Sequence, residues 1–283
     1  MGTTADKLNR IIDTKANIKQ AIIDKGVDVA DDVVFADYPS KISEIQSDGG
    51  KVEIADGTKF AYSTFTDFPE YDISYLSNMT DTSYIFYYCN NLTSLPKIDL
   101  KNSPTLQNAF NRCDNITELS LINTNNIVTM DNAFTGCYKL KEISIDTSAV
   151  TKAYQSFSNC NSLLKLNINT SKMTDMRLML NNCTSLTDLG ALDASSLPSI
   201  TFTNNIFSKC TALMNFGGLL NIKYSYSISD STKLTVESLM NCINGLADLT
   251  GGTSQTLTMG STNLSKLTSE QIAIATSKNW TLA

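Results

Sequence analysis

The chain contains no histidine among its 283 residues. Histidine is the commonest general base, the usual activator of a nucleophile and the commonest metal ligand, so its absence removes the groups on which most catalytic and metal sites are built. No run of about 18 apolar residues is present, which argues against a membrane-spanning helix. Residues 1–20 are polar and amphipathic, without the apolar segment of a signal peptide. We therefore expect a protein that is not an enzyme and has no catalytic residue, metal, cofactor or membrane insertion.

Charge is also sparse. The chain has 22 Lys and Arg residues against 28 Asp and Glu, a formal net charge of −6. No block of basic residues is present for a phosphate backbone or an anionic membrane, so nucleic acid is not expected as a partner. Apolar residues make up 42% of the chain, which is enough for a folded protein rather than a disordered one.

Seven cysteines recur at nearly constant intervals. The gaps between them are 24, 24, 23, 23, 27 and 32 residues. An internal repeat of about 20 to 30 residues is typical of a solenoid, in which each coil stacks on its neighbours. The close Cys-x-x-Cys pairs of zinc and redox sites are missing. The cysteines are Cys89, Cys113, Cys137, Cys160, Cys183, Cys210 and Cys242.

Apolar columns accompany the cysteines. The columns lie three residues before each cysteine and three and six residues after it, and we predict that all three are buried. The first column is Phe86, Phe110, Phe134, Phe157, Leu180, Phe207 and Leu239. The second is Leu92, Ile116, Leu140, Leu163, Leu186 and Leu213. The third is Leu95, Leu119, Ile143, Leu166, Leu189 and Phe216.

The residues after each cysteine, such as 116–121 and 140–145, end in alternating apolar and polar residues, which predicts one short strand per coil in a parallel sheet. The return segments, such as 130–136, have helix-like apolar spacing over one or two turns, and we expect short or 3₁₀ helices there. The predicted fold class is an α/β repeat solenoid. It would be a leucine-rich-repeat array with a short parallel strand per coil, capped at both ends and preceded by a small helical module.

Two states of the cysteines are compatible with this arrangement. Coils stacked about 4.8 Å apart lie within the ~4.4–6.8 Å between Cα atoms that a disulfide tolerates. The odd number of cysteines and their apolar surroundings favour reduced, buried thiols that act as small hydrophobic side chains.

Five segments follow from these patterns. Residues 1–46 are predicted to form a helical N-terminal attachment module, and 47–50 a linker. Residues 51–83 are an aromatic-rich N-terminal cap, 84–233 the leucine-rich repeats, and 234–283 a C-terminal cap with a capping box at Thr268 to Gln271. The tyrosines of the cap region close the end of the array or, alternatively, stack on sugar rings.

Residues 3–25 are predicted to form a helix, and its apolar residues, three and four apart, also fit heptad core positions. It either packs within the chain on the residues up to 45 or joins copies in a homo-oligomer. The candidate attachment and oligomer residues are Leu8, Ile11, Ile18 and Ile22.

A polar strip is predicted on the exposed face of the strands, five and seven residues after each cysteine. Stacked polar side chains of this kind either bind a protein or glycan through many weak contacts or form a solvated face with no ligand. Glu118 and Glu142, one coil apart, resemble the paired carboxylates of glycosidases, but no pocket is predicted around them. The candidate ligand face is Glu118, Ser120, Glu142, Ser144, Lys165, Asn167, Asp188 and Asn215.

The repeat, approximately F-x-x-C-x-x-L-x-x-L followed by D/N-T-S, resembles the BspA-type leucine-rich repeat, and residues 173–189 are its clearest copy. The resemblance covers roughly residues 79 to 283. It implies an adhesin or a phage structural protein, since related arrays occur in both.

The start of the chain, Leu8 to Lys15 with Ile18 to Ile22 and Phe35 to Pro39, is similar to short N-terminal modules of tail and fibre proteins in phages of gut bacteria. Together the two resemblances imply a virion protein, a fibre or decoration subunit. It would attach to other virion proteins through the N-terminal module and bind host surface glycan or protein through the repeats. The alternative is a bacterial cell-surface adhesin of the BspA type whose export signal is missing from this sequence.

Overall fold

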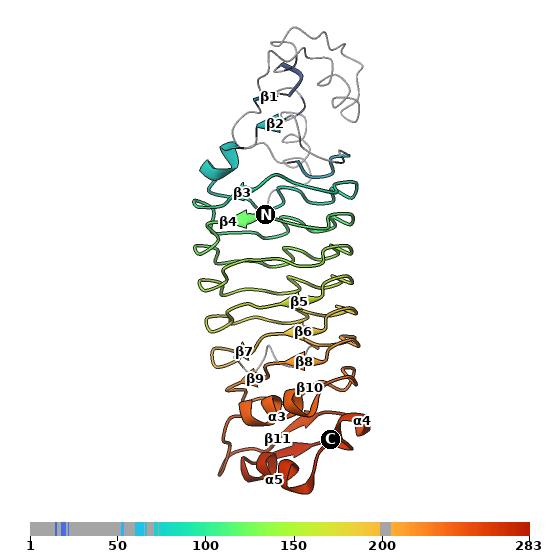
Figure 1. Ribbon diagram of the computed structural model, residues 1–283. Coiled ribbons are helices and arrows are strands. Elements are labelled where there is room, and N and C mark those ends of the chain that lie inside the picture. Colours follow the sequence, from blue (N-terminus) through green and yellow to red (C-terminus); the bar gives the residue numbers. More distant parts are fainter. Residues whose placement is uncertain are drawn as a thin grey trace.

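The computed structural model describes residues 15, 18–20, 22, 52–53, 60–64, 66, 71–72, 74–198 and 205–283. Figure 1 shows the repeats lying one on the next along a single direction, with α3 and α5 at the C-terminal end. The described elements are β1 (Val52–Glu53), β2 (Tyr71–Asp72), η2 (Ser74–Asn78), β3 (Ile98–Asp99), β4 (Leu121–Ile122), β5 (Lys165–Leu166), β6 (Asp188–Leu189), β7 (Leu192–Asp193), β8 (Asn215–Phe216), β9 (Leu219–Leu220), β10 (Tyr226–Ser227), α3 (Val236–Gly245), β11 (Gln255–Thr258), α4 (Ser261–Leu264), α5 (Ser269–Ser277) and β12 (Trp280–Leu282).

Small parallel sheets join successive repeats. β3 pairs with β4, β6 lies between β5 and β8, and β7 pairs with β9. Isolated parallel bridges continue the same contacts where no strand is assigned, as between Ser120 and Ser144. The prediction of a repeat-like α/β fold with short parallel strands is therefore confirmed. The prediction of one strand per coil is wrong in detail. Over 140–145 only the bridge at Ser144 forms, whereas β6 and β7 both follow Cys183, and β8 and β9 both follow Cys210.

The predicted apolar columns form the core. Every residue of the first and second columns is at most 2% exposed, and the third column is buried or half-buried. The rings of Phe86, Phe110, Phe134 and Phe157 stack in sequence, with centroid distances of 5.5, 5.5 and 5.2 Å. Each inner ring therefore buries both of its faces against the rings of neighbouring repeats, which gives large apolar burial per residue.

The prediction of short or 3₁₀ helices in the return segments is wrong. The described residues between 79 and 235 contain no helix, and the return segments are successive hydrogen-bonded turns. Alternate backbone N–H groups donate to the next repeat, as from Phe110 to the Ala133 oxygen and from Arg112 to the Thr135 oxygen, both at 2.8 Å. A helix needs these donors for its own carbonyls.

Residues in the left-handed backbone conformation produce these turns. The residues five and one before each of the first six cysteines have positive φ, a conformation that interrupts a right-handed helix. They are Tyr84, Tyr88, Asn108, Arg112, Asn132, Gly136, Gln155, Asn159, Leu178, Asn182, Asn205 and Lys209.

The repeat register begins before residue 84. Phe60 stacks on Phe86 with a centroid distance of 5.5 Å, and the Tyr62 N–H donates to the Tyr87 oxygen at 2.7 Å. These contacts match those between later repeats, so residues 60–63 add a further turn segment within the range 51–83 that was predicted as a cap.

At the other end, α3 takes the place of a further strand. The Ser238 hydroxyl accepts from the Phe216 N–H and donates to the Met214 oxygen, both at 2.9 Å, and the Asn241 amide donates to the Phe216 oxygen at 3.1 Å. These side chains satisfy backbone groups of Met214 and Phe216 that a following repeat would otherwise pair with. Left unpaired, such groups at a sheet edge would favour association with another chain.

The last elements close the C-terminal end. β10, β11 and β12 form a parallel sheet. Trp280 is 2% exposed, and its indole N–H donates to the Ala247 oxygen at 2.9 Å. The predicted capping box of α5 is present, because the Gln271 N–H donates to the Thr268 hydroxyl and the Thr268 N–H to the Gln271 side chain. Lys278 donates to the oxygens of Ile243 and Asn244 near the end of α3, where a cation is favourable.

Most of the predicted N-terminal module and the 47–50 linker lie outside the described residues, and so do Leu8 and Ile11. Ile18 and Ile22 are helical; Ile18 is half-buried and Ile22 is 2% exposed.

Candidate functional site

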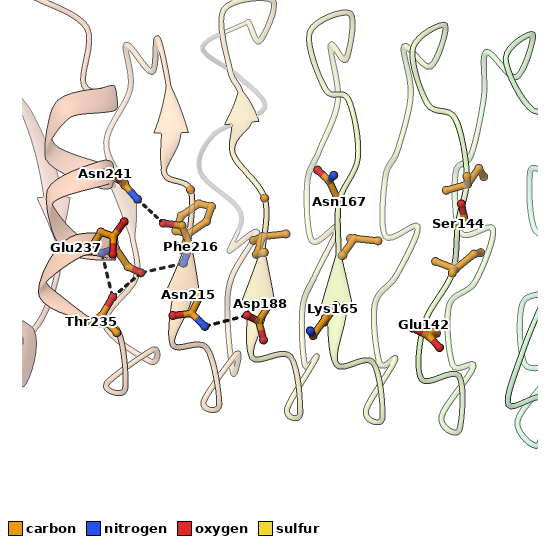
Figure 2. Close-up of a pocket in the computed structure, with 17 residues that line it drawn as sticks. Glu142, Ser144, Lys165, Asn167, Asp188, Asn215, Phe216, Thr235, Glu237 and Asn241 are labelled. Atoms are coloured by element: carbon orange, nitrogen blue, oxygen red, sulfur yellow. Dashed lines mark hydrogen bonds between the residues drawn. The ribbon is translucent and has the colours of Figure 1, made fainter.

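A groove of about 710 Å³ runs along the exposed face of the strands and ends against α3. Figure 2 shows its polar side chains, which come from successive repeats and from the beginning of the helix. Six of the eight residues predicted for the ligand face line it. They are Glu142, Ser144, Lys165, Asn167, Asp188 and Asn215. Glu118 and Ser120 are exposed but belong to the preceding repeat and do not line the groove.

The parallel register brings these side chains together. Lys165 pairs with Asp188, and Asp188 with Asn215, while the next residue of each strand pairs in the same way. Because successive residues of a strand point to opposite faces, the apolar neighbours Leu166 and Leu189 enter the core and the polar residues face outward. A slip of one residue would exchange the two faces. The core columns therefore fix the position of the polar strip.

The groove is acidic. Its charged lining residues are Glu142, Lys165, Asp188 and Glu237, three carboxylates against one ammonium group. The Asp188 carboxylate accepts from the Thr187 hydroxyl at 2.6 Å and from the Asn215 amide at 2.8 Å. These two hydrogen bonds, with a smaller contribution from the Lys165 charge, lower the pKa of Asp188. In the part of the chain that the structure describes, Lys165 forms no ion pair, so its ammonium group is available to a ligand.

Glycine forms part of the groove floor, in the column seven after the cysteine. A Cβ atom on Gly217 would lie 2.4 Å from the Ala191 nitrogen, and one on Gly190 would lie 2.7 Å from the Asn167 Oδ1. Neighbouring repeats therefore approach too closely for a side chain at Gly217, and the Asn167 amide occupies the space beside Gly190. The floor at these two positions is therefore backbone rather than side chain.

The end wall of the groove cannot be identified from the sequence. Thr235, Glu237, Ser238 and Asn241 line this wall, and they belong to the first turns of α3 and its N-cap. Glu237 follows Asn215 by 22 residues, close to one repeat, so the spacing holds a weak signal for its place. The packing of a helix where a strand would otherwise stand cannot be read from that spacing.

The cysteines form no reactive site. All seven are free and buried. Burial raises the pKa of Cys89, Cys210 and Cys242 to about 12, so these thiols stay protonated at neutral pH. The disulfide alternative is not realised in this structure.

Within the described ranges, no cluster of three or more Cys, Asp or Glu side chains is arranged to hold a metal ion. Among the same residues, no helix has the length and apolar character needed to cross a membrane.

The repeats are similar to a known family. The model of a family described as "Mycoplasma protein of unknown function, DUF285" matches residues 104–216, less than half of the chain and within the range predicted as repeats. This match fits the resemblance to BspA-type repeats. No curated protein and no solved structure gives a significant match to the chain.

Proposed function

We propose that this chain is a structural protein of a phage virion, a fibre or decoration subunit that binds the host surface through its repeat array. The observation that carries the binding role is the groove, in which polar side chains of successive repeats converge beside α3. The virion assignment rests on the similarity of residues 8–39 to modules of phage tail and fibre proteins. In this proposal, the N-terminal module contacts other virion proteins and joins copies of the chain.

We propose that the repeats form a solenoid of the leucine-rich-repeat kind. The stacked Phe rings, the parallel bridges and the repeat-to-repeat hydrogen bonds support it. Such an array presents one row of side chains per column at the spacing of its coils, about 4.8 Å. A linear ligand with a regular repeat, a polysaccharide or an extended peptide, would therefore meet equivalent groups along its length.

The mechanism is binding without catalysis. Ionised Asp188 and its neighbours Glu142 and Glu237 favour a ligand that carries hydrogen-bond donors or positive charge, while Lys165 provides one contact for an acceptor. Each such contact is weak on an exposed surface. Several copies of the chain on one particle would multiply these contacts, because linked sites bind at a high effective concentration.

A bacterial cell-surface adhesin of the BspA type is the second candidate. The family match over residues 104–216 favours it, since it concerns the repeats and includes nothing of the N-terminal module. In this case the same groove would bind a host or bacterial surface molecule, and the chain would be located on the cell envelope.

Immunogold electron microscopy with antibodies against the full chain separates the two candidates. Label on purified phage particles, at a constant position on each particle, is the expected result. Label confined to bacterial envelopes, with none on particles, would contradict the virion assignment and support the adhesin.

A further inference from the structure

A cluster of four tyrosines lies at the N-terminal end of the described repeats, away from the groove. Tyr87 lies at its centre, with ring centroids 5.4 Å from Tyr62, 5.3 Å from Tyr84 and 4.6 Å from Tyr88. The three outer tyrosines are 65%, 42% and 37% exposed. These rings therefore contact one another while a large part of their surface faces solvent.

The backbone of the outer tyrosines is unusual. Tyr62, Tyr84 and Tyr88 have φ values of 64°, 61° and 59°, in the left-handed region that bulky residues rarely adopt. Asparagine or glycine occupies six of the ten equivalent positions of the later repeats, and Arg112, Gln155, Leu178 and Lys209 occupy the other four. Asparagine and glycine tolerate positive φ far better than tyrosine does. Tyrosine is thus present at three positions where the backbone disfavours it.

Closing the end of the array does not account for these residues. A cap stabilises by burying its apolar surface, and here Phe60 does so by stacking on Phe86 while Tyr62 remains exposed. Unfavourable backbone conformation combined with exposed side chains is a feature of binding sites, where the protein retains residues that reduce its stability.

The surroundings of the cluster narrow the chemistry of its ligand. The Arg112 guanidinium lies 5.7 Å from the Tyr88 centroid and 5.0 Å from that of Tyr138, so the aromatic surface continues into the next repeats. Arg112 is neutralised by Asp114, with Nε–Oδ1 at 3.0 Å and Nη2–Oδ2 at 3.1 Å. The surface is therefore aromatic and carries phenol hydroxyl groups. The cation at its edge, Arg112, is already paired with Asp114.

We propose that Tyr62, Tyr84 and Tyr88 form a binding platform for a neutral oligosaccharide. Pyranose rings present flat C–H faces that stack on aromatic rings, and their hydroxyls bond to phenol groups. Three exposed rings are too few for the roughly 800 Å² per partner of a stable protein interface. The platform is separate from the groove, and this inference does not depend on the virion assignment.

The test uses the full chain with cellohexaose, chitohexaose and maltohexaose, each titrated by calorimetry and saturation-transfer NMR. We expect at least one of them to bind with a Kd of about 1 mM or below. The double variant Tyr62→Asn/Tyr88→Asn and the single variant Tyr84→Asn should each weaken this binding at least about tenfold. Because asparagine suits positive φ, both should melt at the same temperature as the natural chain or higher.

The variant Leu178→Asn is the matched control. Leu178 has a φ of 54° in the same column as Tyr84 but lies in a repeat far from the cluster, so its replacement should leave oligosaccharide binding unchanged. The proposal is overturned if the natural chain binds none of the three sugars, or if the asparagine variants bind as tightly as it does. Lower melting temperatures with unchanged binding would show that the rings belong to the cap. Loss of a protein partner from the asparagine variants, without any oligosaccharide binding by the natural chain, would assign the platform to protein recognition instead.

Discussion

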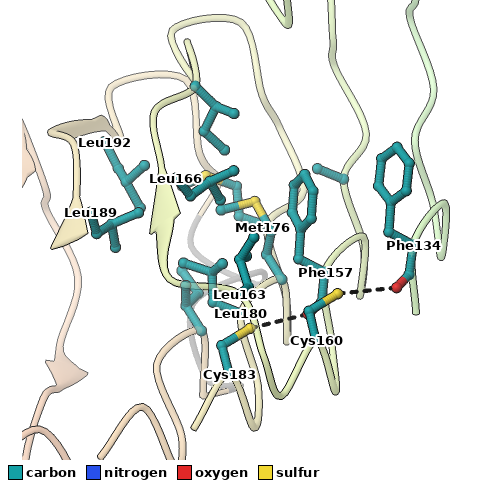
Figure 3. Packing of buried hydrophobic residues seen from close by; sticks show 14 of the residues in the cluster. Phe134, Phe157, Cys160, Leu163, Leu166, Met176, Leu180, Cys183, Leu189 and Leu192 are labelled. Atoms are coloured by element: carbon teal, nitrogen blue, oxygen red, sulfur yellow. Dashed lines mark hydrogen bonds between the residues drawn. The ribbon is translucent and has the colours of Figure 1, made fainter. Parts of the chain in front are cut away.

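The thiol of Cys160 donates a hydrogen bond of 3.2 Å to the carbonyl oxygen of Phe134, one repeat earlier in the chain (Figure 3). The same oxygen accepts the backbone N–H of Cys137 at 3.1 Å, so each turn carbonyl serves its own repeat and the next. The cysteine column therefore links repeats through hydrogen bonds as well as by packing. The equivalent bonds run from Cys89 to Phe60, Cys113 to Phe86, Cys137 to Phe110, Cys183 to Phe157 and Cys210 to Leu180.

Replacing Cys160 tests whether the thiol acts as a donor. Cys160→Ala removes the donor and leaves a small cavity, and we expect it to lower the free energy of unfolding by about 1–2 kcal/mol. Cys160→Ser keeps a donor of similar size and should destabilise less than alanine. Urea denaturation of the three proteins measures both differences. If alanine is tolerated better than serine, the thiol acts only as a small hydrophobic side chain.

The buried thiols also predict the stability of the protein at high pH. The pKa of Cys89, Cys210 and Cys242 is raised from 9.0 to about 12 in the folded chain. Above pH 9 the unfolded chain releases these protons while the folded chain retains them, so unfolding is favoured as the pH rises. The stabilisation is thus complete below pH 9 and decreases between pH 9 and about 12. Urea midpoints that stay constant to about pH 11 would contradict this expectation.

The phenylalanine stack predicts a large effect of one truncation. Phe134 is fully buried between the rings of Phe110 and Phe157. Phe134→Ala should lower the free energy of unfolding by about 3–5 kcal/mol, because the cavity between two fixed rings cannot collapse easily. Lys152→Ala, at an exposed position, is the control and should change it by less than about 0.5 kcal/mol. Equal stability of both variants would undermine the assignment of this column to the core.

Much of this arrangement could be predicted from the sequence, because each repeat places the same residue type at the same position. The buried columns around Cys137 and the exposed strip through Glu142 and Lys165 follow directly from that register. The return segments could not be predicted, since residues such as Arg112 and Leu178 give no sign that their φ is positive. Their apolar spacing is compatible with a helix, and only the hydrogen bonds to the next repeat exclude one.

The groove could not be predicted from the sequence either, for a different physical reason. Its end wall requires α3 to stand where the next strand would pair, with Ser238 bonded to β8. Its floor depends on the close approach of Gly217 to Ala191, which a glycine in a sequence does not specify. Tertiary contacts between segments 20 to 30 residues apart determine both features.

Exchanging two charges in the groove tests whether this surface binds the host, as we propose. Glu142→Lys with Lys165→Glu keeps the net charge but inverts the local pattern, and both positions are exposed. We expect adsorption to host cells to fall roughly 3–10-fold, because charge complementarity controls association. The melting temperature should not change. Glu118→Lys, just outside the groove, is the control and should have a smaller effect. Unchanged adsorption of the groove variant would count against this surface.

The most direct test of the account is the stacking of successive repeats. Ser120 and Ser144 form a parallel bridge and are both exposed, so their Cα atoms lie about 4.8 Å apart, within the ~4.4–6.8 Å range for a disulfide. The variant Ser120→Cys/Ser144→Cys should form this bond under mild oxidation, and the buried native thiols should not react. In Ser120→Cys/Asn167→Cys the two positions lie two repeats apart, about 9.6 Å, and should stay reduced. Mass spectrometry of non-reduced peptides distinguishes the two. A disulfide in the first variant alone is the predicted result, and its absence there, or equal cross-linking in both, would contradict the stacked arrangement.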